Sequence, residues 1–219
     1  MDSFKQGLAK YNKTITELSK TGENNVLLEN DFEMISLDDM SSDLVKFKDN
    51  TLSTADALFI DDKNMFHIIE FKNINFDNKK DRLLSEFYLN HAIDVIDSCE
   101  HNCKLYNHES KFHKYLIDKS KLALRLKPVE SLSLLYHYLC KYDDEENSKK
   151  TLFNIKKKYW LVSKTGSDLN NPFSKNKQNN RRRNNKQLFS YLIKFKPYFY
   201  LDVHAINDKD FEKVLKSWL

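Results

Sequence analysis

The sequence predicts an α/β domain on three observations. Apolar residues recur at helical spacing near the N-terminus, two strand-like runs separated by a turn occupy residues 55–72, and another helical pattern follows them directly. A chain of 219 residues can bury one substantial core, with roughly 70% of its unfolded surface removed from water at this size. We therefore expect a single domain over residues 1–219.

The first expected element is an amphipathic helix that ends near Gly22. Its apolar stripe consists of Phe4, Leu8, Tyr11, Ile15 and Leu18. Farther along the chain, the segment DLVKFKD at residues 43–49 alternates between polar and apolar residues, which is typical of a strand.

The runs ADALFI and MFHIIEFK within residues 55–72 predict a β-hairpin, because the intervening DDKN has the composition of a turn. A turn centred near Lys63 places Asp56 directly opposite Glu70, and opposed residues have Cβ atoms about 4.5 to 5.5 Å apart. Side chains alternate along a strand, so Lys72 shares the face of Glu70. We expect the three charged groups to converge.

Two helical patterns follow the hairpin, at residues 79–100 and 111–142, and the second is expected to break near Pro128. We interpret residues from about 100 to 157 as a helical insertion in the domain. An apolar stripe in the second helix is predicted to belong to the core rather than to a partner surface. It contains Leu132, Leu135, Tyr136 and Leu139.

The C-terminal part is predicted to add two strands and a last helix. The runs YWLVSK at 159–164 and YFYLDVHAI at 198–206 are strand-like, and the closing helix is expected to take Asp208 as its N-cap.

Composition excludes several classes of protein. Only three glycines occur, and the sequence has neither a dinucleotide-binding fingerprint nor a phosphate-binding P-loop. The first residues lack an apolar signal core, and no run approaches the roughly 18 apolar residues of a membrane span. Three cysteines do not suit a disulfide framework. We therefore expect a soluble, cytoplasmic protein.

The cysteines and histidines suggest other chemistry only weakly. Cys99 and Cys103 flank His101, which raises the question of zinc, but buried thiols on a helix explain this spacing as well and no second ligand pair follows. His67 is expected on the strand face opposite Glu70, as a packed histidine rather than a catalytic base.

The charges of the hairpin admit two interpretations. Two close carboxylates repel each other unless a cation lies between them, and oxygen ligands of this kind suit Mg²⁺ or Mn²⁺, with Lys72 beside the metal. The alternative is a solvated sheet face with an ordinary cross-strand ion pair, worth well under about 1 kcal/mol. The apolar neighbours expected on this face favour a site. They are Leu58, Ile60, Phe66 and Ile68.

Ala55 and Asp56, followed by IIEFK on the next strand, resemble the PD-(D/E)xK nuclease superfamily. The resemblance implies a restriction-endonuclease-like αβββαβ core and hydrolysis of phosphodiester bonds. It also implies Mg²⁺ or Mn²⁺ held by Asp56, Glu70 and the backbone carbonyl of Phe71, with Lys72 helping to activate the attacking water.

Families of this kind often add an acid from the first helix. Glu17 is the glutamate in the helix expected there, and Glu29 or Glu33 takes this role if the helix boundary differs. Ala55 stands where the family name has proline, and the helix after EFKN lacks the glutamine-and-tyrosine pattern of the RecB-like branch, so the resemblance assigns no subfamily.

A basic tract follows, since no acid occurs between Leu169 and Leu201. Its cations are predicted to bind the phosphates of nucleic acid, although a solvated loop is an equal alternative. They are Lys175, Lys177, Arg181, Arg182, Arg183 and Lys186. Phe189 and Tyr191 are expected in the core, whereas Phe173 is a candidate for stacking on bases.

The leading hypothesis is a metal-dependent nuclease acting on DNA, with RNA as the second choice. A catalytically inactive nucleic-acid-binding module of the same fold is the first alternative, and a protein-interaction module is the second. A homodimer is compatible with each.

Overall fold

The computed structural model describes residues 2–21, 25–44, 52–72, 109–164 and 192–218. A mixed sheet of six strands has the order β1-β4-β5-β6-β7-β8. Its strands are β1 (Asn12–Thr14), β4 (Glu33–Ser36), β5 (Ala57–Ile60), β6 (Phe66–Lys72), β7 (Lys157–Ser163) and β8 (Asp202–Asn207). Neighbours are antiparallel from β1 to β6, whereas β6, β7 and β8 run parallel. Strands β2 (Lys20–Thr21) and β3 (Asn25–Val26) form a separate pair.

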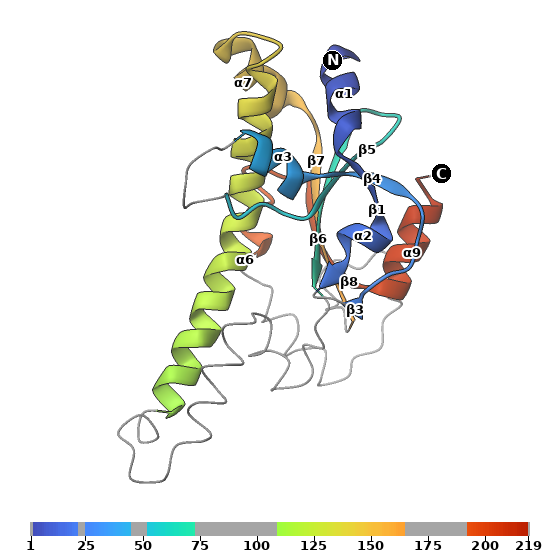
Figure 1. Cartoon of the computed structure of the whole chain (residues 1–219). Helices are drawn as coiled ribbons and strands as arrows, with labels where there is room; N and C mark the ends of the chain where they lie inside the picture. The colour runs from blue at the N-terminus through green and yellow to red at the C-terminus, as the bar shows by residue number, and fades with distance from the viewer. Residues whose placement is uncertain (1, 22–24, 45–51, 73–108, 165–191, 219) are drawn as a thin grey trace.

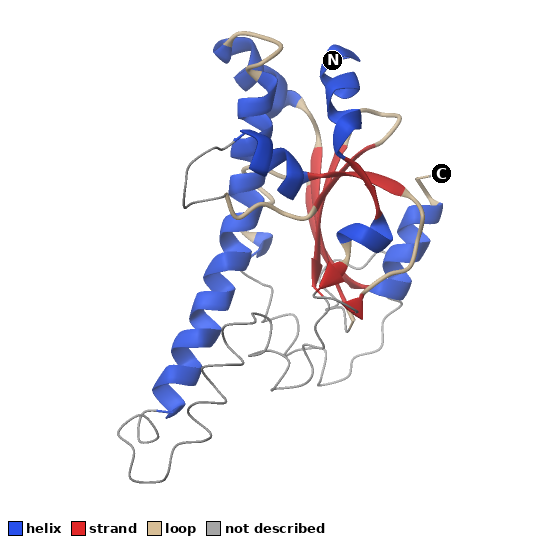
Figure 2. Ribbon diagram, in the orientation of Figure 1, coloured by secondary structure: helices blue, strands red, loops and turns tan. Residues whose placement is uncertain are grey.

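Helices cover both faces of the sheet, with the long helix α6 on one side and α9 on the other (Figures 1 and 2). The helices are α1 (Asp2–Leu8), the 3-10 turn η1 (Ala9–Tyr11), α2 (Ile15–Leu18), α3 (Leu37–Leu44), α6 (Glu109–Leu139), α7 (Glu145–Asn154) and α9 (Asp208–Lys216). The predicted α/β class is confirmed. Among the described helices, none is both long and apolar enough to cross a membrane.

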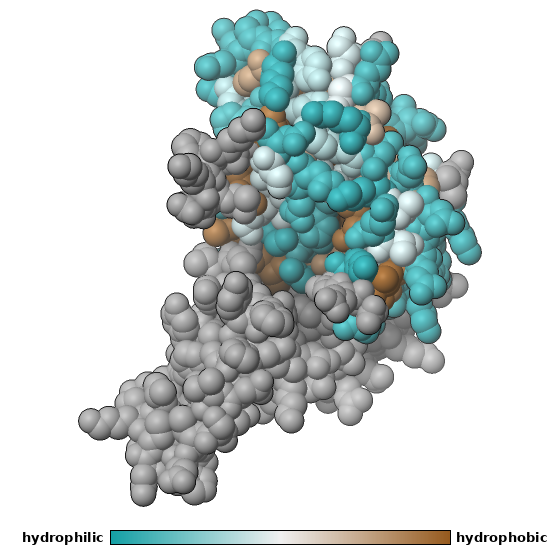
Figure 3. Space-filling view, viewed as in Figure 1, coloured by the Kyte–Doolittle hydropathy of each residue, from teal (hydrophilic) through white to brown (hydrophobic). Residues whose placement is uncertain are grey.

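Alternate side chains of the interior strands supply two hydrophobic clusters, one on each face of the sheet. Phe66 and Ile68 of β6 pack in the cluster that contains α1, α3, α6 and α7. Ile69 and Phe71 pack in the cluster that contains α2 and α9. Because β6 is covered on both faces, every residue of the strand except Lys72 is buried, as expected for an interior strand. Over the described residues, the face seen in Figure 3 is largely hydrophilic, with apolar side chains in scattered spots.

The predicted hairpin is confirmed, including its register. Leu58 pairs with Ile68 and Ala57 pairs with Ile69, so the same register continued by one residue sets Asp56 opposite Glu70. The Asp61 carboxylate accepts hydrogen bonds from the backbone N–H groups of the turn. Asn64 adopts a positive φ of 58° there, a conformation that asparagine tolerates better than most residues.

The prediction of one N-terminal helix extending to Gly22 is wrong. Helix α1 ends at Leu8, η1 and β1 follow, and α2 begins after Thr14. Thr14 and Glu17 form a reciprocal capping box, which satisfies backbone donors and starts a new helix. The apolar residues are nevertheless interior, because a chain that winds across the sheet buries them as well as one helix would. Phe4, Leu8, Tyr11 and Ile15 are buried.

Three local predictions are also corrected. The segment expected to be a strand at 43–49 begins inside α3, and residues 45–49 lie outside the described part. The side chain of Ser36 caps the start of this helix by accepting the Asp39 N–H. Helix α6 continues through Pro128 without a break, since its neighbours on both sides pack against the core. Asn207, one residue before Asp208, caps α9 by accepting the Asp210 N–H at 2.7 Å.

The predictions for the remaining elements are confirmed in part. Strand β7 confirms the run at 159–164, but β8 begins at Asp202 because residues 195–199 form turns. The predicted helix at 79–100 lies outside the described residues. Leu132, Leu135 and Leu139 are in the core as expected, with Tyr136 packed against them. Helices α6 and α7, in the region interpreted as an insertion, form part of this same core.

Candidate active site

The structure brings Asp56, Glu70 and Lys72 together as the hairpin register requires. Glu70 lies on β6 with its side chain 0% exposed, and the Lys72 ammonium is 3.0 Å from its Oε1. Asp56 immediately precedes β5, and its Oδ2 accepts the Phe71 N–H at 2.5 Å. These residues share the sheet face that packs against α6.

A fourth charged group, absent from the set predicted from the sequence, completes the cluster. Lys127 of α6 places its Nζ 2.9 Å from Glu70 Oε2 and 3.7 Å from Asp56 Oδ1. The same ammonium donates to the Thr54 carbonyl at 2.8 Å. A cation therefore does lie between the two carboxylates, and the protein itself supplies it.

Helix α6 also fixes the backbone that carries Asp56. The Ala55 N–H donates to Ser131 Oγ at 2.8 Å, and the Ser53 N–H donates to the Glu130 carboxylate. From the other side, the Leu37 N–H donates to the Asp56 carbonyl at 3.1 Å. These contacts hold the strand entrance in place, which a metal ligand or catalytic acid requires.

Asp38 is a second addition from outside the predicted set. It lies in the first turn of α3, and its Oδ1 accepts the Thr54 hydroxyl at 2.9 Å. Loss of hydration around the carboxyl group raises the pKa of Asp38, an effect that Lys127 opposes and Glu70 reinforces. The residue is exposed overall, so it lies at the rim of the cluster.

Burial and charge shift the protonation of the cluster. Burial raises the pKa of Asp56 to about 7, and the neighbouring Glu70 adds to the shift while Lys127 and Lys72 oppose it. Burial lowers the pKa of Lys127, but the carboxylates of Glu70 and Asp56 outweigh this, so its pKa lies above the usual value. The ammonium is thus retained and Asp56 is poised between its two forms near neutral pH.

The cluster contains carboxylate oxygens of the kind that bind hard divalent cations. Both Glu70 oxygens are buried, and ion pairs with Lys72 and Lys127 are the only polar contacts that the described residues make with them. Together with Asp56 they offer oxygen donors of the kind that Mg²⁺ prefers. Within the described parts of the chain, no three His, Cys, Asp or Glu side chains gather closely enough to hold a metal by themselves.

The predicted extra acids lie apart from this cluster. Glu17 is exposed and serves the capping box of α2, where its carboxylate accepts the Thr14 N–H at 2.9 Å. Glu29 is exposed in the loop before β4. The reason is the early end of α1, which gives the first helix no glutamate. Asp38 occupies the place near Glu70 that was expected for one of them.

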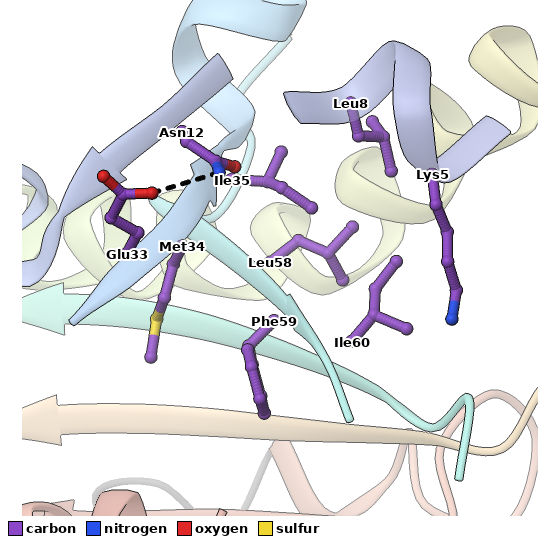
Figure 4. Close-up of a pocket in the computed structure, with 9 residues that line it drawn as sticks. All are labelled: Lys5, Leu8, Asn12, Glu33, Met34, Ile35, Leu58, Phe59 and Ile60. Atoms are coloured by element: carbon purple, nitrogen blue, oxygen red, sulfur yellow. Dashed lines mark hydrogen bonds between the residues drawn. The ribbon is translucent and has the colours of Figure 1, made fainter. Parts of the chain in front are cut away.

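Glu33 borders a different hollow, shown in Figure 4. This pocket of about 180 Å³ opens where β4 diverges from β5, with Leu58 and Ile60 among its apolar walls. Glu33 Oε2 accepts the Asn12 side-chain amide at 3.3 Å at its rim. Neither Asp56 nor Glu70 lines the pocket, so Glu33 belongs to a separate surface.

The predicted phosphate-binding residues at 175–186 lie outside the described residues, as do Phe173, Phe189, Tyr191 and the pair Cys99 and Cys103. The acid-free stretch also contains Lys194 and Lys196, which the structure describes. Lys196 forms an ion pair with Asp202 at 3.1 Å. His67 is packed as expected: Trp160 Nε1–H donates to its Nδ1 at 3.2 Å, on the face away from Glu70.

The sequence does carry one signal for Lys127. Counted along α6, it falls on the apolar stripe that contains Leu124, Leu134, Leu135 and Tyr138. A lysine on the buried stripe of a helix requires a partner in the core, and Glu70 of the predicted hairpin is an acid that needs one as well. The sequence does not show that these two segments, far apart in the chain, lie close together in space.

The contacts of α6 predict that Ser131→Ala destabilises the fold. The substitution leaves the buried Ala55 N–H without its acceptor, which costs about 1 to 3 kcal/mol. Chemical denaturation of wild type and variant measures the difference. Ser133→Ala, on the same helix and without such a bond, is the matched control, and equal stability of all three proteins would contradict the docking described.

The shifted Asp56 predicts a pH dependence of stability. The folded-state pKa of about 7 exceeds the ordinary 3.8, so this group's contribution is fully present below about pH 4 and is lost as pH rises through about 7. The free energy of unfolding of wild type, relative to Asp56→Asn, should fall by about 2 kcal/mol between about pH 5 and about pH 7.5. Denaturation curves at both pH values measure it, with the exposed Asp31→Asn as control. A constant difference would show that Asp56 ionises normally.

Comparison with protein-family models, with curated proteins and with solved structures yields no match. The geometry of the cluster around Glu70 is therefore the basis for assigning a function.

Proposed function

We propose that the chain is a metal-dependent nuclease that hydrolyses phosphodiester bonds, with DNA favoured over RNA. The observation that carries the proposal is the opposition of Asp56 and the buried Glu70 on neighbouring strands, with Lys72 on the same face. Two acids and a lysine in this arrangement suit metal-assisted attack of water on a phosphate. The order α1, β4, β5, β6, α6, β7 supports an αβββαβ core with additions near the N-terminus.

In this proposal Asp56, Glu70 and the Phe71 carbonyl hold Mg²⁺ or Mn²⁺, which when bound lowers the pKa of water and stabilises charge on the phosphate. The Lys72 side chain is 26% exposed, and its ammonium forms an ion pair with Glu70. Because solvent reaches this side chain, the ammonium can orient a water or contact a phosphoryl oxygen. Asp38 takes the place of Glu17, Glu29 and Glu33 as the additional acid.

The basic residues at 175–186 supply the nucleic-acid contact in this proposal. The absence of acids between residues 169 and 201 gives that part of the chain a positive charge, although the net charge of the whole chain is only +4. Neutralised phosphates release counterions, so binding should weaken as salt increases.

One observation favours the inactive binding module as a second candidate. Two lysines neutralise Asp56 and Glu70 without any metal, because Lys127 already lies between them. A site of this composition is stable as a purely structural ion-pair network, and the fold would then only present its basic surface.

Metal binding separates the two candidates before any substrate is chosen. Wild type is expected to bind Mn²⁺, and the Asp56→Asn/Glu70→Gln double variant to bind at least about a hundredfold more weakly, because both carboxylates are replaced. Isothermal titration of chelator-treated proteins at about pH 8 measures the affinities. The double variant Asp31→Asn/Glu212→Gln removes two exposed carboxylates as the control. Equal affinity in all three proteins would exclude this pair as the metal site.

Cleavage assays test the reaction itself. Glu70→Gln and Lys72→Ala are expected to lower Mg²⁺-dependent cleavage at least about a hundredfold, while nucleic-acid affinity changes little because the basic tract is intact. Single- and double-stranded DNA and RNA are assayed, with fluorescence anisotropy for binding and Lys209→Ala as the matched lysine control. Salt-sensitive binding by wild type without cleavage of any substrate would identify the inactive module instead.

A further inference from the structure

Lys127 occupies an unusual position for a surface-type side chain. Its ammonium lies 2.9 Å from Glu70, 3.7 Å from Asp56 and 2.8 Å from the Thr54 carbonyl, and the side chain is only 14% exposed. It enters from α6, the layer that faces the sheet, whereas Lys72 extends from β6 itself. Among the residues that the structure describes, Lys127 is the cation that contacts both carboxylates.

This ammonium and a divalent cation need the same carboxylate oxygens. Asp56 and Glu70 carry two negative charges when ionised, which Lys72 and Lys127 balance. A divalent cation added between the acids would then leave an excess of two positive charges in a largely buried site. Repulsion of that kind in a medium of low dielectric is strongly unfavourable, so one cation must withdraw.

Lys127 is the cation that can withdraw. Its ammonium is a compact charge on a flexible four-carbon chain, and the Thr54 carbonyl provides a contact that does not depend on either metal ligand. Asp38 lies nearby and interacts with Lys127. Lys72, in contrast, forms its ion pair with Glu70 and sits where the proposed reaction uses it.

We propose that Lys127 is an internal counter-cation that holds the metal-free carboxylates together and competes with the divalent cation for them, withdrawing when the metal enters. The inference rests on the proposed metal site and concerns a residue that the resemblance does not include. Lys127 is a positioning residue in this scheme, because it acts through Asp56 and Glu70. The metal-free site is thereby preorganised without the repulsion that would spread its ligands apart.

The first test compares Mn²⁺ affinity in wild type and Lys127→Met, which keeps most of the length of the side chain and removes its charge. At about pH 8, the variant is expected to bind Mn²⁺ about tenfold more tightly, because no ammonium has to be displaced. Lys209→Met, on the exposed side of α9, is the control and should match wild type. An unchanged or weaker affinity in folded Lys127→Met would overturn the inference.

The second test uses the wild-type chain and so does not depend on the folding of a variant. Lysines are acetylated briefly with and without Mg²⁺, and peptides are quantified by mass spectrometry. Withdrawal from the carboxylates should increase the labelling of Lys127 several-fold on adding Mg²⁺, relative to the exposed Lys209 as internal reference. Equal labelling of Lys127 in both conditions would show that the ammonium stays in place.

The outcomes distinguish this inference from the proposed metal site. If wild type and Lys127→Met bind Mn²⁺ equally while Asp56→Asn/Glu70→Gln does not bind it, the metal site stands and the competition is refuted. If neither protein binds Mn²⁺, the carboxylate pair is not a metal site and both ideas are refuted. Binding by Lys127→Met alone would support the competition in its strongest form.

Discussion

A fully buried carboxylate on an interior strand is the constraint from which much of this structure follows. Glu70 has no access to solvent, and an unpaired charge there would cost several kcal/mol, a large share of the stability of a domain. Lys72 on its own strand reaches only one of its oxygens. The second oxygen needs a cation from another layer, which Lys127 of α6 provides. The position of α6 on the sheet is therefore determined by charge as well as by apolar packing.

The same helix links stability to the geometry of the candidate site. Ser131 and Glu130, within a turn of Lys127, bond the backbone on either side of Thr54, so the entrance to β5 and the orientation of Asp56 depend on α6 docking. A buried ion-pair network of this kind is seldom the most stable solution, since well-packed apolar residues of similar volume often do as well or better. Its presence beside an acid with a raised pKa agrees with the proposed function, because perturbed acids of this kind cluster at functional sites.

The features that the sequence predicts correctly are those decided locally. The hairpin register follows from two alternating runs and a four-residue turn, so the opposition of Asp56 and Glu70 can be derived from the sequence by itself. The prediction of a single N-terminal helix is wrong because the same apolar spacing allows these residues to be buried in more than one backbone conformation. The pair Thr14 and Glu17, three residues apart, carries the capping signal that ends this ambiguity. Asp38 and Lys127 depend on contacts across long stretches of chain, which no local pattern specifies.

The two interpretations of the hairpin charges are thus less opposed than the sequence alone indicates. A structural ion-pair network and a metal site both require a cation between Asp56 and Glu70, and they differ only in which cation it is. In the proposed metal site, the lysine holds the two carboxylates together before a hard cation enters, so part of the cost of gathering them is met during folding. In the proposed scheme, exchange of a tethered ammonium for a divalent ion would leave the strand pairing of the sheet in place. It would change the contact between α6 and the sheet, which makes that interface the part of the fold that metal binding would affect.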